Sequence, residues 1–127
     1  MLNNILQNKK TLVISIVVVF TLVVAGVWMF LNQPSSEPIG MILFYGDTCS
    51  HCANLEDFIV KNKIEDKVKF TRLEVFNNQD NANILVSKAQ ICKIDLSQGA
   101  PVPFFWDGKT CIIGDQAIMD FMQNKAK

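Results

Sequence analysis

The chain has 127 residues, half of them hydrophobic, and its 12 basic and 12 acidic side chains balance to a formal net charge of zero. This length suits one small domain with an appendage. Because the charges form neither a basic stripe nor an acidic tail, we expect no nucleic-acid partner and no strongly basic protein partner.

The hydrophobic residues gather near the N-terminus. Residues 11–31 carry no charged side chain, and a helix of that length spans about 31 Å, close to the roughly 30 Å hydrocarbon core of a bilayer. We expect a transmembrane helix there, between a tail at residues 1–10 and a linker at residues 32–40. Lys9 and Lys10 precede the helix. They predict a single-pass anchor in the cell membrane, with the N-terminus cytoplasmic and the C-terminal domain extracytoplasmic.

A cleaved signal peptide is the alternative interpretation of this segment. The apolar region of a signal peptide usually has roughly 7–15 residues, and a site with small residues closes it. The run at residues 11–31 is longer and ends without such a site. We therefore expect the helix to remain attached as an anchor.

Residues 41–127 form the predicted folded domain, in which hydrophobic periodicity indicates four strands and three helices. The predicted strands are residues 41–45, 68–76, 104–106 and 110–113, and the predicted helices are residues 50–62, about 80–92, and one that opens at Gly114-Asp115. The first strand is a continuous apolar run, and the second alternates in β-forming residues. Asp80 or Asn81 is the expected cap of the middle helix. Asp107-Gly108 is a hairpin turn signal.

The order of these elements, β-α-β-α-β-β-α, predicts an α/β fold. A strand, a helix and a second strand imply a right-handed parallel crossover, and the terminal hairpin supplies antiparallel partners. We expect a four-stranded mixed sheet with helices on both faces, preceded by the transmembrane helix.

Cys49 and Cys52 stand where the first strand gives way to the first helix. Two cysteines three residues apart around a helix start can come within the separation that a disulfide requires. The free N–H groups and the helix dipole stabilise a thiolate there. We expect Cys49 to be the nucleophile and Cys52 to resolve the mixed disulfide, while His51 adds positive charge that favours the thiolate.

Zinc and iron–sulfur centres also use a C-x-x-C pair, so metal binding is the competing chemistry. A structural zinc site would need a second pair of ligands. Cys92 and Cys111 are 19 residues apart, and His51 is the only histidine. We expect no metal and no cofactor other than the redox-active disulfide Cys49–Cys52. A membrane-anchored module that binds a partner or a metal without catalysis is the alternative from another class.

Three segments together resemble the thioredoxin superfamily, and most closely its glutaredoxin-like members. They are the strand MILFYG, the segment DTCSHC at a helix start, and a proline at the head of the FFW strand. The resemblance extends over roughly residues 40–125. It implies a thioredoxin-like fold and a thiol–disulfide oxidoreductase that acts on protein thiols and disulfides, together with a membrane redox partner that recycles the cysteine pair.

The same resemblance implies a cis-proline before the third strand, which in this superfamily holds the substrate's extended chain against the reactive cysteine. Val102-Pro103 matches it best, and Ala100-Pro101 is the second candidate. A cis peptide bond before proline is uncommon enough to be a specific structural feature.

Two departures from the family patterns bear on the reaction. Histidine before the second cysteine resembles protein disulfide isomerases and periplasmic disulfide oxidases, which implies an oxidase or isomerase; an extracytoplasmic reductase is the alternative. Gly114-Asp115 stands where many glutaredoxins have Gly-Gly near their glutathione site.

The remaining cysteines, Cys92 and Cys111, allow two interpretations. Cysteine is among the most buried residue types, so both can be silent core thiols. An extracytoplasmic location favours instead a structural disulfide that ties the second helix of the domain to the last strand.

Overall fold

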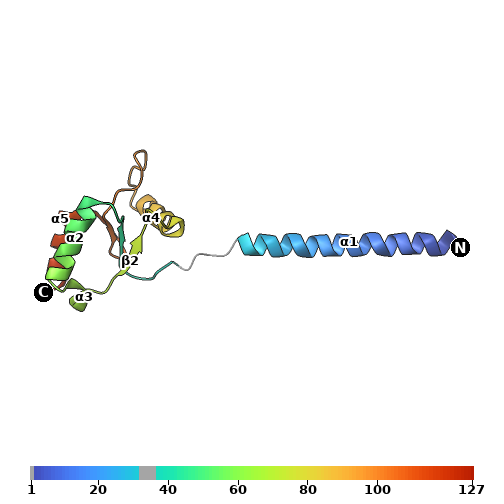
Figure 1. Cartoon of the computed structure of the whole chain (residues 1–127), viewed down its shortest axis with the longest axis horizontal. Coiled ribbons are helices and arrows are strands. Elements are labelled where there is room, and N and C mark those ends of the chain that lie inside the picture. Colours follow the sequence, from blue (N-terminus) through green and yellow to red (C-terminus); the bar gives the residue numbers. More distant parts are fainter. Residues whose placement is uncertain (1, 32–36) are drawn as a thin grey trace. The chain divides into compact units, whose positions relative to one another are not determined.

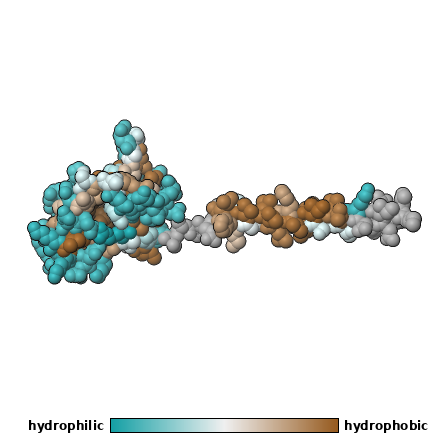
Figure 2. Space-filling view, in the orientation of Figure 1, coloured by the Kyte–Doolittle hydropathy of each residue, from teal (hydrophilic) through white to brown (hydrophobic). Residues whose placement is uncertain are grey.

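The computed structural model describes residues 2–31 and 37–127, and the chain divides into two compact units, residues 1–36 and 37–127 (Figure 1). In the first unit, α1 (Leu2–Leu31) is a single helix. Its section Thr11–Leu31 is long and apolar enough to cross a membrane, and none of the residues in its most apolar stretch is buried within the structure. Figure 2 shows apolar residues along this section.

The helix α1 extends N-terminally beyond its apolar section. It includes residues 2–10 without a break, so the described part of the predicted tail at residues 1–10 is helical. No proline or glycine lies in this stretch to interrupt the backbone hydrogen bonds. Most of the predicted linker, residues 32–36, lies outside the described residues.

The second unit is built around one four-stranded sheet with the order β2-β1-β3-β4. Its strands are β1 (Ile42–Tyr45), β2 (Thr71–Glu74), β3 (Phe104–Trp106) and β4 (Cys111–Ile113). Strand β1 runs parallel to β2 and antiparallel to β3, and β3 pairs antiparallel with β4. The expected mixed sheet is therefore confirmed.

Helices cover both faces of this sheet, as expected. They are α2 (Ser50–Lys61), α3 (Ile64–Lys67), α4 (Gln79–Ile91) and α5 (Asp115–Lys125). Figure 1 shows α4 on one side of the sheet and α2 with α5 on the other. Ile42 and Phe44 of β1 pack in the core cluster that includes α4, and Leu43 between them packs in the cluster that includes α2 and α5. Successive strand residues alternate between faces, so this fully buried strand has to be apolar throughout. Apart from the short helix α3, the element order and the mixed sheet are those that the sequence predicts.

The segment between α2 and α4 differs from the expectation. The sequence predicts one strand at residues 68–76, but the strand covers only Thr71–Glu74, and the short helix α3 precedes it. Val68 at the end of α3 is 3% exposed because it packs with α2 and α5. The buried position of Val68 requires an apolar residue, and this residue extends the apolar alternation of β2 towards the N-terminus. The sequence pattern therefore looks like a strand longer than the one in the structure.

The cap of α4 also differs from the expectation. Asn78, rather than Asp80 or Asn81, has the extended backbone of a capping residue, and its side-chain oxygen accepts the N–H of Asn81 at 3.1 Å. Asp80 and Asn81 already lie in the first turn. Several consecutive Asn and Asp residues are all competent caps, so the sequence alone did not identify which one ends the preceding loop.

Candidate active site

Cys49 and Cys52 lie at the start of α2, directly after the turn that follows β1. The N–H of Cys49 donates to the carbonyl oxygen of Gly46 at 3.2 Å. Cys49 is the capping residue of α2, and its sulfur accepts the N–H of Cys52 at 3.3 Å. The sulfur therefore occupies the place that a Ser or Asp oxygen takes at other helix starts. A negative charge on Cys49 would be stabilised there by the N–H group and the helix dipole.

The two thiols, both free in this structure, have different surroundings. Cys49 is half-buried, whereas Cys52 is 8% exposed. Burial, followed by the side-chain hydrogen bond with Cys49, raises the pKa of Cys52 to about 12. A partly exposed sulfur in front of a buried one is the arrangement that an attacking and a resolving cysteine require.

The loop before β3 brings a third element to the site. The peptide bond Val102–Pro103 is cis, and among the described residues it is the only cis bond. The thiol of Cys49 donates to the carbonyl oxygen of Val102 at 3.7 Å. Pro103 itself is buried, and its carbonyl oxygen accepts the N–H of Gly114 at 3.0 Å. Of the two candidate prolines, Pro103 is thus the one that lies beside the cysteine pair.

His51 contacts a residue to which the sequence analysis gave no functional role. Its Nδ1 lies 3.2 Å from Oδ2 of Asp115, the first residue of α5. The amide of Asn54 donates to the same oxygen at 3.5 Å. The hydrogen bond with His51 is the largest cause that holds the pKa of Asp115 below its usual value. The imidazole remains 69% exposed.

A pocket of about 200 Å³ opens beside both cysteines, and its lining includes Asp47, Glu56 and Arg72. Arg72 forms an ion pair with Glu56. Pockets that bind small molecules usually have roughly 300–1,000 Å³, so this one is small for such a ligand. It is large enough to admit water to Cys52.

The residues that the structure describes contain no group of three or more His, Cys, Asp or Glu side chains arranged to hold a metal ion.

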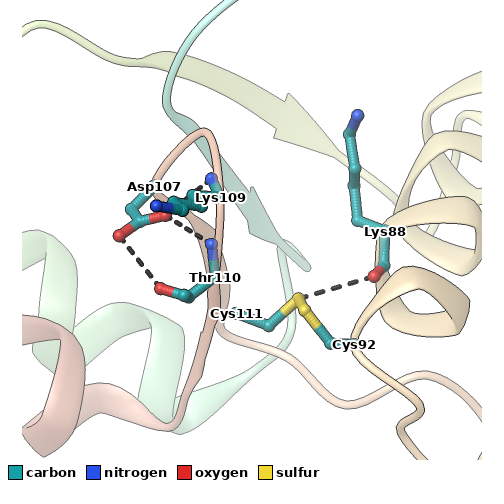
Figure 3. The surroundings of a disulfide bond; sticks show 6 residues. All are labelled: Lys88, Cys92, Asp107, Lys109, Thr110 and Cys111. Atoms are coloured by element: carbon teal, nitrogen blue, oxygen red, sulfur yellow. Dashed lines mark hydrogen bonds between the residues drawn. A yellow bond between two sulfur atoms is a disulfide. The ribbon is translucent and has the colours of Figure 1, made fainter.

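Cys92 and Cys111, the two cysteines outside the C-x-x-C pair, are joined in a disulfide with their Cα atoms 6.2 Å apart (Figure 3). Of the two interpretations open from the sequence, the structure therefore has the disulfide. It ties the end of α4 to β4, and Sγ of Cys111 lies 3.4 Å from the carbonyl oxygen of Lys88.

No protein-family model and no curated protein matches the chain in sequence. Among solved structures, a buckwheat glutaredoxin in complex with glutathione is 15% identical with a TM-score of 0.45, over 67% of this chain and 69% of its own. A glutaredoxin from Archaeoglobus fulgidus is 13% identical with a TM-score of 0.48, over 72% of this chain and 98% of its own.

Proposed function

We propose that this protein is a thiol–disulfide oxidoreductase in which Cys49 attacks or is attacked and Cys52 resolves the intermediate. The observation that carries the proposal is the placement of the two sulfurs. The Cys49 sulfur caps α2 at 3.3 Å from the N–H of Cys52, while Cys52 itself is buried. The redox-active disulfide between them is the only cofactor that this chemistry needs.

Oxidation of a substrate dithiol by the Cys49–Cys52 disulfide takes two displacements. A substrate thiolate attacks Sγ of Cys49, a substrate–Cys49 disulfide forms, and the S–S bond to Cys52 breaks. Cys52 leaves with the electron pair and takes up a proton, for which the adjacent pocket gives water access. The second substrate thiolate then attacks the substrate sulfur and releases Cys49 as a thiolate. The substrate loses two electrons, and the cysteine pair gains them.

Val102 and Pro103 are the proposed substrate-binding residues. The Val102 carbonyl oxygen reaches the Cys49 thiol at 3.7 Å. A peptide that lies along this loop would therefore bring its own sulfur close to Cys49. We infer protein thiols and disulfides as substrates, since the cysteine of an extended chain can reach a partly exposed sulfur such as that of Cys49 more readily than a cysteine in a folded interior can.

The direction we propose is oxidation or isomerisation, and extracytoplasmic reduction is the alternative. The support is the helix N–H that points at the Cys49 sulfur. A stabilised thiolate favours the reduced pair, which makes the disulfide form a stronger oxidant. A redox partner in the membrane then has to reoxidise Cys49 and Cys52 after each turnover.

A redox titration of the full chain in detergent tests the proposal. Wild type should show one two-electron transition and should catalyse disulfide exchange in a scrambled protein substrate. Cys49→Ser should abolish the exchange, and Cys52→Ser should accumulate a mixed disulfide with the substrate, because attack still occurs but resolution does not. Ser50→Ala, an exposed position between them, is the matched control and should remain active. Exchange that survives in Cys49→Ser, or activity that a chelator removes, would contradict the assignment.

We further propose that α1 is a single-pass anchor with a cytoplasmic N-terminus and an extracytoplasmic domain. Lys9 and Lys10 beside the apolar section of α1 support this orientation. The disulfide Cys92–Cys111 also supports it, because such bonds persist in oxidising compartments.

An impermeant thiol reagent applied to intact cells tests this orientation. After mild reduction, the reagent should label wild type at Cys49, and Cys49→Ser should lose that label. Labelling that appears only after lysis would reverse the proposed orientation.

A further inference from the structure

The imidazole of His51 is held by a carboxylate from a different element of the fold. His51 lies on α2 between the two cysteines, and its Nδ1 is 3.2 Å from Oδ2 of Asp115 on α5. The Asp115 side chain is 23% exposed, and the amide of Asn54 also donates to it at 3.5 Å. The structure shows no hydrogen bond between His51 and either cysteine, both of which lie in its described part.

We infer that Asp115 is a positioning residue that restrains the oxidising power of the Cys49–Cys52 pair by holding and neutralising His51. The inference rests on the proposed function and names the residue that regulates it. A free imidazolium at this place would stabilise a thiolate at Cys49, and the disulfide form would then be a stronger oxidant. The Asp115 carboxylate opposes this effect because its negative charge offsets the positive charge of the imidazolium.

The sign of the effect follows from the charges. An imidazole is either neutral or carries one positive charge. The charges of His51 and an ionised Asp115 therefore sum to between minus one and zero, whereas with asparagine at position 115 the sum lies between zero and plus one. Removing the carboxylate therefore never makes the surroundings of the cysteine pair more negative. The Asp115 charge already acts on the pair, because it contributes to the raised pKa of Cys52.

Position adds to the charge effect. The hydrogen bond to Asp115 directs the imidazole towards α5. Without that partner, the exposed side chain of His51 can adopt rotamers that bring its charge closer to Cys49. The consequence is specific: the effect of losing Asp115 should be larger when His51 is present than when it is absent.

The test is a glutathione redox titration of the full chain in detergent at pH 5.5. An acidic pH favours the charged form of imidazole in general. Asp115→Asn should shift the equilibrium about threefold towards the reduced protein, as expected for one charge at a partly exposed site. For two electrons this is about 14 mV in the oxidising direction. In a His51→Gln background, the same substitution should give less than half of that shift.

Matched variants separate this role from helix stability. Asp115→Glu keeps the charge and should stay near wild type, whereas Asp115→Ser keeps a side chain suited to a helix start and should behave like Asp115→Asn. Asp120→Asn removes a charge from the same helix at an exposed position, where Asp120 accepts a hydrogen bond from Gln116 at 3.0 Å. It should leave the potential unchanged. Thermal unfolding of each variant checks that the domain remains folded.

Each outcome has one meaning. Equal shifts in the two backgrounds would mean that Asp115 acts by its own charge alone and would overturn the inference, as would no shift or a shift towards the oxidised protein. A wild type that forms no redox-active Cys49–Cys52 disulfide would instead refute the proposed function, and this result is visible before any variant is made.

Discussion

Alkylation of the reduced protein at pH 8 should modify Cys49 and leave Cys52 unmodified. The thiolate is the reactive form of cysteine. Burial, followed by the hydrogen bond with Cys49, raises the pKa of Cys52 from 9.0 to about 12. Three pKa units mean about 1,000-fold less thiolate at a given pH. Iodoacetamide followed by peptide mass spectrometry should therefore find one adduct per chain.

The pH dependence and a denatured sample provide the controls. The reactivity of Cys52 should rise tenfold per pH unit up to about pH 12, and urea should bring both cysteines to similar rates. In Cys49→Ser, the hydrogen bond from the neighbouring thiol is lost but burial remains, so Cys52 should stay slow. Reaction of Cys52 at the rate of a free cysteine in the native protein would contradict the burial that the proposed resolving role requires.

The proposed mechanism makes use of this difference in reactivity. A buried thiol with so high a pKa is a poor competitor for substrate disulfides. Substrates should consequently react with Cys49 alone, and Cys52 should act only on a mixed disulfide that already lies at Cys49. The neighbouring sulfur is then present at a very high effective concentration, which compensates for its small thiolate fraction.

The parts of the site that the sequence predicted depend on local signals. Cys49 and Cys52 follow an apolar strand and open a helix, and both features are encoded within a few neighbouring residues. Val102-Pro103 directly precedes an apolar strand, and its place beside the cysteine pair was implied by the resemblance to the thioredoxin superfamily. The same local reasoning gave the four strands and the two helical faces of the sheet.

The contact between His51 and Asp115 could not be predicted in this way. The two residues are 64 positions apart, and their distance depends on how α5 packs against α2. The only sequence signal was an acidic residue at the start of the last helix, which by itself indicates a favourable helix dipole contact. Likewise, the distance between Cys92 and Cys111 depends on the placement of α4 beside β4, so both interpretations of these cysteines stayed open.

Removing the disulfide with the double variant Cys92→Ser/Cys111→Ser should cost about 3 kcal/mol of unfolding free energy. The bond closes a loop with a sequence separation of 19, and in the chain-entropy model a loop of that size contributes this amount. In a domain of under 100 residues the loss should lower the melting temperature by about 12–24 °C. Denaturant and thermal unfolding of both proteins measure it.

The double variant is preferable to a single one, because Cys92→Ser alone would leave Cys111 free to react with Cys49. The closed loop contains Val102, Pro103 and all of β3, and it therefore restrains the segment that we propose as the substrate-binding loop. At a temperature where the variant is still folded, exchange activity should fall as well, with a larger change in KM than in kcat. An unchanged melting temperature, together with two native free thiols outside the C-x-x-C pair in wild type, would mean instead that Cys92 and Cys111 are unpaired core thiols.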